Sequence, residues 1–490
     1  MQPAPEQPER TLGVTLPFVA IVLAMLPAVL DQTILSTALP TIAGDLGRLT
    51  DVSWVITAYV VAAAASTPLW GKLGDRHGRK RLLEIALVLF LAASAACGAA
   101  GDMTSLIVSR AVQGAAAGGL MSLAMAAVGD LVSPRERARY QGYIMAAFAL
   151  ATVAGPLIGG VLVQHASWRL VFYVNLPLGA VALAGLQLRL PAAEGDGARG
   201  PLDAVGAALL AAATIALMLA CVWGGDRYGW GSAPILGLLA ATAVLGAAFV
   251  ARERRAADPV VPLTLLRTRT VAIVSVGLFL TTAAFFAVNV FVPLFLQATT
   301  GASPTQAGLL LVPMMVGITV STNVAGRAIA KTGRYKAIPV AGLGLMTVAL
   351  VLLGIVAGHP SQVATALVLV VFGLGFGVVG QVLMVAVQNE VDRRQLGVAV
   401  ATTTFFRGLG GAIGAAVLGA VFAAHARTSL GGVHALSPSG RAGLIDGVQT
   451  VLFVAAPIAA LALLVVLLLH ERPLQQFQPR PVTAPRSARA

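Results

Sequence analysis

Apolar runs of about 20 residues recur along the whole chain, and they constrain its fold more than any other feature. At about 1.5 Å of rise per residue, a helix of that length crosses the hydrocarbon core of a bilayer. Apolar residues make up 58% of the 490 residues and charged residues only 11%, which is too little charge to cover a soluble protein of this size. The sequence therefore predicts an all-α integral membrane protein.

The apolar runs predict about fourteen transmembrane helices, separated by short segments rich in turn-forming residues. Their expected ranges are 14–39, 52–71, 82–100, 104–129, 138–163, 168–188, 203–223, 232–251, 270–293, 305–328, 337–357, 361–386, 397–423 and 447–469.

The formal charge of +13 would suggest a nucleic-acid ligand in a soluble protein, but here the basic residues set the orientation in the membrane. Of the 33 Lys and Arg residues, 26 lie in the two termini and in the loops after even-numbered helices, five lie in the other loops, and two lie within helices. We name the side that carries the 26 residues the basic side. The rule that basic loops stay inside predicts that this side, with both termini, is cytoplasmic, and that the protein is a multi-pass protein of the cell membrane.

An internal repeat divides the chain into two halves. Residues 71–81 (GKLGDRHGRKR) and 326–336 (GRAIAKTGRYK) share glycines seven apart and an arginine directly after the second glycine, while Ala330 replaces Asp75. The repeat predicts six helices, two extra helices and six more, in two parallel-related halves with the substrate site between them. The expected ranges are a tail at 1–13, a first half at 14–190, linker helices at 200–255, a second half at 268–470 and a tail at 471–490.

Five motifs in order along the chain resemble the fourteen-helix drug:proton antiporters of the major facilitator superfamily. The motifs are Leu30–Pro40 (LDQTILSTALP), Gly71–Arg81, Arg110–Gly114 (RAVQG), Gly155–Gly160 (GPLIGG) and Trp168–Gly179 (WRLVFYVNLPLG). The resemblance implies a secondary active exporter that uses inward proton movement to expel amphipathic small molecules, cationic drugs and antibiotics included.

Asp31 and Arg110 are the candidate proton-coupling residues. A carboxylate in the middle of a lipid-exposed helix costs about 2.5–3.5 kcal/mol on insertion scales, so Asp31 is expected to face a cavity or a partner. Arg110 lies about 9 Å, and Asp31 about 13 Å, from the same face of the membrane, so the two can pair. The alternatives are a structural hydrogen bond for Asp31, and for Arg110 a side chain that extends to the membrane interface.

The loop after the second helix is the candidate cytoplasmic gate. The resemblance implies that Asp75 and the neighbouring arginines tie this gate shut through charge and a helix terminus. The expected gate residues are Gly71, Asp75, Arg76, Gly78, Arg79 and Lys80 of the loop, together with Asp130 at the end of the fourth helix. Because Ala330 replaces the acid in the second copy, that copy is expected to matter less.

The fifth helix carries the antiporter motif of Gly155, Pro156, Gly159 and Gly160. These residues weaken the helix and remove side-chain bulk. The motif has two interpretations, a hinge or tight seal against the opposite half, and ordinary packing through small residues.

A substrate cavity between the halves is expected to be apolar, with a few polar groups. For each aromatic candidate, packing in the core or against lipid is the alternative. Arg407 is a candidate for function because a charge within the membrane is costly. The candidate cavity residues are Gln113, Phe285, Phe286, Asn289, Asn323, Gln381, Phe405 and Arg407. The outer loop at about 424–446 is either a cap over the outer mouth or a linker.

Chemistry of other kinds has no support in the sequence. It holds no Walker loop, no metal-ligand spacing and no nucleophile setting, so no cofactor, no metal and no enzymatic activity are expected. The expected partners are a small-molecule substrate, protons and the lipid bilayer; no nucleic acid is expected, and no periplasmic adaptor is specified. The alternatives to a drug exporter are an exporter dedicated to one metabolite, lipid or siderophore, and a membrane sensor that does not transport.

Overall fold

The computed structural model describes residues 8–46, 52–132, 134–191, 203–225, 227–300, 311–358, 361–392, 395–425 and 438–473. Within these ranges the chain is helical, and the only β-pairing is an isolated bridge between Gly224 and Tyr228. Thirteen helical segments there are long and apolar enough to cross a membrane, and α14 (Val312–Thr332) adds a further helix of 21 residues. The predicted all-α membrane fold of about fourteen helices is therefore confirmed.

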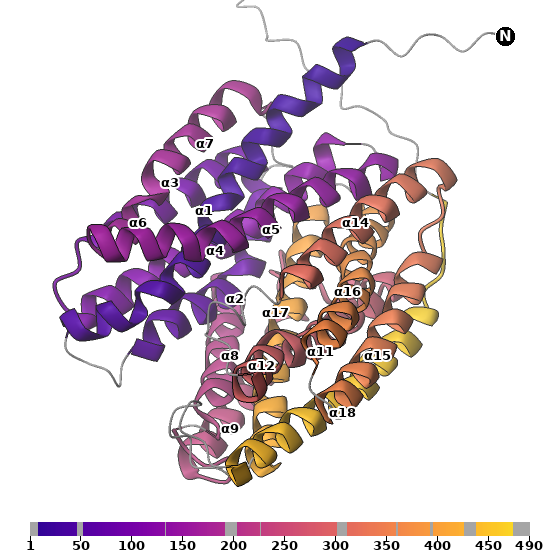
Figure 1. Ribbon diagram of the computed structural model, residues 1–490. Coiled ribbons are helices and arrows are strands. Elements are labelled where there is room, and N and C mark those ends of the chain that lie inside the picture. Colours follow the sequence, from indigo (N-terminus) through magenta and orange to yellow (C-terminus); the bar gives the residue numbers. More distant parts are fainter. Residues whose placement is uncertain are drawn as a thin grey trace, which may run out of the picture.

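The first half contains the helices coloured indigo to magenta in Figure 1. Its buried core is formed mainly by α1, α3, α4 and α7. The helices of this half are α1 (Pro8–Leu46), α2 (Val52–His77), α3 (Arg79–Gly98), α4 (Met103–Leu131), α5 (Pro134–His165), α6 (Leu170–Tyr173) and α7 (Asn175–Arg189).

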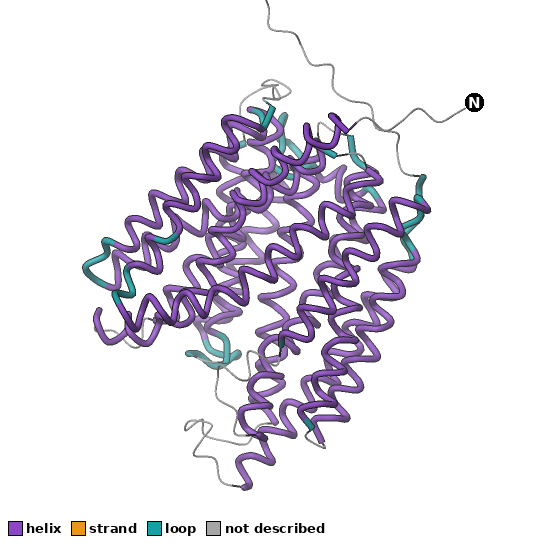
Figure 2. The backbone as a smooth tube through the Cα atoms, turned by 45° about the horizontal axis from the view of Figure 1, so that its top comes forward, coloured by secondary structure: helices purple, strands orange, loops and turns teal. Residues whose placement is uncertain are grey.

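The second half has a core of its own, which runs from Leu265 to Leu469. Its helices are α10 (Leu263–Arg267), α11 (Arg269–Phe286), a π-helical turn η2 (Ala287–Phe291), α12 (Val292–Thr300), α14, α15 (Ala337–Gly358), α16 (Gln362–Glu390), α17 (Leu396–His425) and α18 (Pro438–Leu467). Figure 2 shows that the long helices of the chain run roughly lengthwise beside one another.

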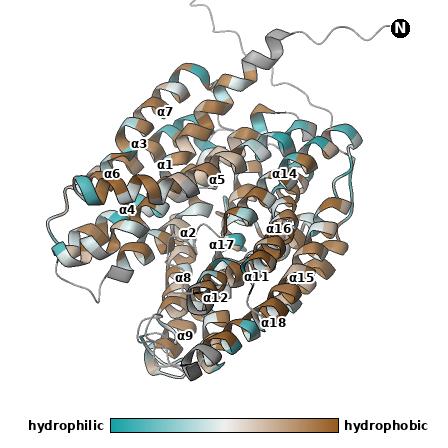
Figure 3. Cartoon of the chain, viewed as in Figure 1, coloured by the Kyte–Doolittle hydropathy of each residue, from teal (hydrophilic) through white to brown (hydrophobic). Residues whose placement is uncertain are grey.

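Two extra helices, α8 (Ala204–Trp223) and α9 (Ala233–Glu253), connect the halves. α8 packs where the halves meet, because its Met218 contacts Val61 of α2 and Leu409 of α17. α9 is largely exposed, which suits a helix that faces lipid. Figure 3 shows apolar residues along the bodies of the helices and hydrophilic residues at their ends, as a bilayer requires.

The loops that follow the predicted even-numbered helices carry most of the basic residues. Contacts among these loops place them at one end of the molecule. The loop after α2 bonds to the loop after α9 through Lys72 and Asp258, to the end of α4 through Arg79 and Asp130, and to the end of α7 through Lys80. Further bonds connect the end of α16 to the chain after α18 and that segment to the loop after α14. The alternating path predicted from the basic residues is thus the path that the chain follows.

Two predicted helices differ in detail from the structure, and proline explains both differences. The sixth is split into α6 and α7 at Val174, because Pro177 has no N–H to donate to the carbonyl of Tyr173. The ninth contains η2, just before Pro293, which likewise cannot donate to the carbonyl of Asn289. The first helix is longer than predicted, Pro8–Leu46 rather than 14–39.

Several predicted features lie outside the described residues. The tail at 1–7, most of the outer loop at 426–437, and the chain after 473 are among them. The predicted start of the tenth helix, 305–310, also falls there, and α14 is described from Val312 onward.

Candidate functional site: a buried charge network and a gate

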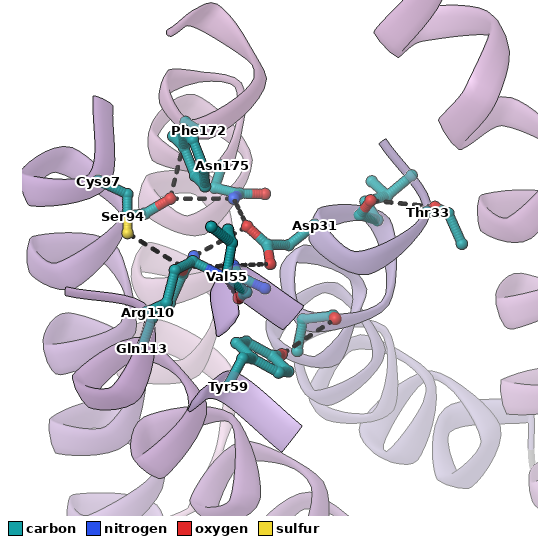
Figure 4. Close-up of polar contacts among 12 residues, drawn as sticks. Asp31, Thr33, Val55, Tyr59, Ser94, Cys97, Arg110, Gln113, Phe172 and Asn175 are labelled. Atoms are coloured by element: carbon teal, nitrogen blue, oxygen red, sulfur yellow. Dashed lines mark hydrogen bonds and ion pairs between the residues drawn. The ribbon is translucent and has the colours of Figure 1, made fainter. Parts of the chain in front are cut away.

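Asp31 of α1 and Arg110 of α4 form an ion pair inside the first half. The Nη1 atom of Arg110 lies 2.5 Å from Oδ2 of Asp31, and the two side chains are 1% and 0% exposed. Figure 4 shows both side chains pointing at each other between their helices. The structure therefore brings together the two residues that the sequence placed at matching depth.

Two amide side chains complete the shell of Asp31. Gln113 donates from Nε2 to Oδ1 of Asp31 at 2.9 Å, and its own Oε1 accepts from Arg110 at 2.7 Å. Asn175 of α7 donates to the same Oδ1 at 3.2 Å and to Ser94 of α3 at 3.0 Å. The carboxylate of α1 thus bonds residues of α4 and α7, and Asn175 extends the network to Ser94 of α3 (Figure 4).

Arg110 is held from its other sides as well. Its Nε donates to the backbone oxygen of Val55 at 3.1 Å, and its guanidinium carbon lies 4.3 Å from the ring centre of Tyr59. The hydroxyl of Tyr59 donates to the backbone oxygen of Ala28 at 3.3 Å, which ties α2 to α1 beside the pair. Cation–π contact and charge-assisted bonds fix the guanidinium in one orientation.

A buried pair of this kind responds strongly to the loss of one charge. Removing one partner leaves an uncompensated charge away from water, at a cost of about 3–5 kcal/mol. Protonation of Asp31 would have a related effect, because Arg110 would then be left with neutral acceptors only.

The antiporter motif packs against α1 close to Asp31. A Cβ atom on Gly155 would lie 2.0 Å from Oγ1 of Thr33, and one on Gly159 would lie 2.8 Å from the backbone oxygen of Ile34. Gly160 has open space around its Cα. In this conformation Gly155 and Gly159 seal the interface between α5 and α1 within one half, and not an interface with the opposite half.

The gate residue Asp75 joins the two halves at the basic side. Its carboxylate accepts from the backbone N–H of Gly397 at 2.9 Å and of Val398 at 2.8 Å, in the first turn of α17. Arg79 bonds the same carboxylate at 2.7 Å and also pairs with Asp130. First-turn N–H groups have no partner within their helix, so an acid at this end stabilises the contact twice, by hydrogen bonds and by the helix dipole.

Glycine makes this approach of α2 to α17 possible. A Cβ atom on Gly71 would lie 2.4 Å from Cβ of Ala401 and 2.7 Å from the backbone oxygen of Gly397. Gly78, between α2 and α3, has a φ of 90°, which side-chain-bearing residues rarely adopt. Lys80 donates to the last carbonyls of α7, and Arg76 pairs with Asp258 at 3.3 Å.

Sequence reasoning missed a second contact between the halves at the same side. Arg137 of α5 donates to the backbone oxygen of Gln388 of α16 at 2.9 Å and to that of Gly129 of α4 at 2.5 Å. Gln388 in turn donates toward the oxygen of Met125 at 3.5 Å. The sequence did not single out Arg137, because it is one of many basic residues in the loops. Its acceptors are backbone oxygens, which no sequence motif marks.

The candidate cavity residues do not form one cluster. Gln113 belongs to the Asp31 shell, Phe285 stacks on Phe376 at 4.2 Å, and Phe405 packs in the apolar contact between α2, α8 and α17. Asn289 is exposed, and Asn323 bonds its own helix and faces α5. Phe286 lies near Gly411, Gln381 is buried, and Arg407 is partly buried.

The other missed contacts come from the sixth-helix motif, and one of them, from Asn175, reaches Asp31. Asn175 lies in that motif, and its position there was the available signal. From the start of the same motif, the indole N–H of Trp168 donates to Asp45 at 2.8 Å, and Arg169 pairs with Asp45 at 3.2 Å. These two contacts hold the pKa of Asp45, at the end of α1, below its usual value.

The two helical halves, joined by contacts at one end, form the fold of a membrane transporter. The profile of the Major Facilitator Superfamily matches residues 21–415, and the chain belongs to this superfamily.

The curated relatives have names of transporters or of multidrug resistance proteins. The multidrug transporter protein MdtP of Bacillus subtilis is 36% identical over 419 residues, which cover 85% of this chain and 76% of that protein. Multidrug resistance protein 3 of the same species is 33% identical over 82% of this chain and 78% of its own length. An uncharacterized MFS-type transporter of Mycobacterium tuberculosis is 40% identical over 83% of this chain, but the match spans only 59% of that relative.

Solved structures share the fold at low sequence identity. The human organic anion transporter MFSD10 superposes with a TM-score of 0.67 and 19% identity, covering 94% of this chain and all of that one. The proton:xylose symporter XylE gives 0.66 and 14%, covering 93% and 95%. At these identities the likeness shows the fold alone.

Proposed function

We propose that this protein is a proton-driven antiporter that exports amphipathic small molecules such as drugs or antibiotics. The observation that carries the proposal is the buried network of Asp31, Arg110, Gln113 and Asn175, which places a protonatable group where four helices meet. The membership of the superfamily and the multidrug relatives support export as the direction.

The coupling that we propose runs from Asp31 to the gate through the helices. A proton on Asp31 breaks the ion pair and frees Arg110, which changes how α4 packs on α1. α4 also ends at Asp130, the partner of Arg79 in the gate. A change at one site can therefore bias the other, provided that each is a two-state element.

The proposed orientation places the gate in the cytoplasm of the cell. The support is the concentration of basic residues at the end where the even-numbered loops meet. With the gate shut at that end, the described conformation would be the one that faces outward. Protons would enter from the outer side, near the Asp31 network.

The test is dye flux in proteoliposomes with an imposed pH gradient. The probes are two xanthene dyes of matched shape, anionic fluorescein and cationic rhodamine 123, so that both charge classes are covered. Asp31→Asn should abolish gradient-driven flux, because the amide cannot exchange a proton. Asp45→Asn is the matched control on the same helix, and it should retain flux because Asp45 is exposed at the end of α1.

Two results would count against the proposal. Full gradient-driven flux by Asp31→Asn would remove Asp31 from the coupling. Failure of the wild-type protein to move either dye, and a wider panel of drugs, would favour an exporter dedicated to one metabolite, or a sensor that does not transport.

A further inference from the structure

Arg407 is the one deep charge of the described membrane helices that has no partner there. The other two deep charges, Asp31 and Arg110, neutralise each other. Arg407 lies in α17, and among the described residues it makes no hydrogen bond and no ion pair. Within the described residues, the middle of the membrane region therefore carries one uncompensated positive charge.

Contacts between α17 and α2 place Arg407 near the middle of the membrane. Ala401, before Arg407, lies against Gly71, and Leu409, after it, packs with Val61. Val61 and Gly71 flank the centre of α2, which spans Val52–His77. A guanidinium at this depth is costly for an isolated helix, so it is expected to face protein or water and to meet an acceptor during the transport cycle.

Helix geometry places Gln381 of α16 at about the level of Arg407 in the membrane. Thr403 of α17 contacts Met384 of α16 through Oγ1 and Sδ at 3.7 Å. The two helices run in opposite directions. On α17, Arg407 lies one turn beyond Thr403 on the same face; on α16, Gln381 lies one turn before Met384 on the same face. Both steps lead away from the basic side, so Arg407 and Gln381 reach a similar depth. The side chain of Gln381 is 7% exposed and makes no hydrogen bond with the described residues.

The guanidinium of Arg407 and the amide of Gln381 lie at a similar depth, and neither has a hydrogen-bond partner among the described residues. We propose that Arg407, assisted by the amide of Gln381, binds an anionic group of the substrate, a carboxylate or a sulfonate. The planar guanidinium offers a fork of N–H donors that matches such groups in a bidentate manner. The inference rests on the proposed export function and names its substrate class, amphipathic anions.

The expected preference follows from the balance of charge. The negative charge of Asp31 is matched by Arg110 and bonded by two amides, so it offers little attraction to a cation in this conformation. Arg407 attracts anions and repels cations across a medium of low dielectric constant. A hydrogen bond to a charged group contributes about 1.5–3 kcal/mol, which corresponds to a change in affinity of about 10- to 150-fold.

The test measures binding and flux of the same two dyes. Wild-type protein in detergent should bind fluorescein at least about tenfold more tightly than rhodamine 123. Arg407→Gln should lose about 10- to 150-fold in fluorescein affinity without loss of rhodamine 123 affinity, and Arg407→Lys should retain part of the fluorescein affinity. Arg227→Gln, an exposed arginine near the end of α8, is the matched control and should bind fluorescein as the wild type does.

The outcomes separate this inference from the proposed function. Proton-driven flux of rhodamine 123 with no preference for fluorescein in the wild type would overturn the anion site and leave the exporter intact. Unchanged fluorescein affinity in a folded Arg407→Gln protein would do the same. If that variant fails to fold, the wild-type preference decides the matter alone. Tight, Arg407-dependent fluorescein binding without any gradient-driven flux would support the site and count against the exporter.

Discussion

Replacing Asp75 by Asn should weaken the gate by an amount that the contacts allow us to work out. The carboxylate accepts from two backbone N–H groups of α17 and from Arg79. An asparagine keeps one acceptor oxygen and turns an NH₂ group toward a donor, so about one to two charge-assisted bonds are lost, at about 1.5–3 kcal/mol each. A loss of about 3 kcal/mol shifts a two-state equilibrium about 150-fold toward the state with the gate open.

The assay is the distance between spin labels on opposite halves at the basic side. His77 at the end of α2 and Thr332 at the end of α14 are both exposed, and cysteines there can carry the labels once Cys97 and Cys221 are replaced. Asp75→Asn should broaden the distance distribution toward longer values and reduce dye flux, while the amount of protein in the membrane stays unchanged.

The matched control for Asp75→Asn is Asp258→Asn. Asp258 is a carboxylate at the same side that bonds Lys72 and Arg76 but, among the described residues, makes no bond to α17. It should leave the label distances close to those of the wild type. If the label distances and the flux of Asp75→Asn match those of the wild type, the proposed role of Asp75 in closing the gate is refuted. The reason is that the expected loss of stability rests on the bonds from Asp75 to α17.

Three further predictions test packing and orientation. Gly71→Ala should also hold the gate open, because a Cβ atom there meets Ala401 and the backbone of Gly397; the same label distances should lengthen. Gly159→Ala should lower the melting temperature of the purified protein, while Gly160→Ala, with open space around it, should not; equal melting temperatures would refute the tight α5–α1 contact. Cysteines at Ser437 and Ala198, both outside the described residues, should react with an impermeant outside reagent at Ser437 only; the reverse pattern would invert the proposed orientation.

The sequence predicted the helices and the charge pair because both follow from the membrane alone. A bilayer demands long apolar helices, and it makes a buried acid and a buried base at equal depth natural partners. That reasoning reached Asp31 and Arg110, but it assigned Gln113 to a substrate cavity. In the structure Gln113 instead donates to the carboxylate of Asp31, because Gln113 lies one turn from Arg110 on the face of α4 that meets α1.

The sequence could not supply the partners that lie on backbone atoms. The sequence identified Asp75 as a candidate gate residue, but not the groups that it binds. These are the backbone N–H groups of Gly397 and Val398, which do not depend on the side chains at those positions. Arg137 likewise donates to two backbone carbonyls. Such contacts depend on where helices begin and end in space, and neither periodicity nor composition records that.

The two halves carry their charges in different ways, and this difference gives the repeat a functional meaning. The first half holds a neutralised pair and the gate carboxylate Asp75. The second half has Ala330 at the position that corresponds to Asp75, and Arg407 has no counter-charge among the described residues. A proton can change the first half, because it contains a group to receive one; the second half offers a fixed positive charge, which a proton leaves unchanged. We therefore expect coupling to reside in the first half and selection of the substrate in the second, so that Arg407→Gln alters which dye moves and Asp31→Asn stops the movement of both.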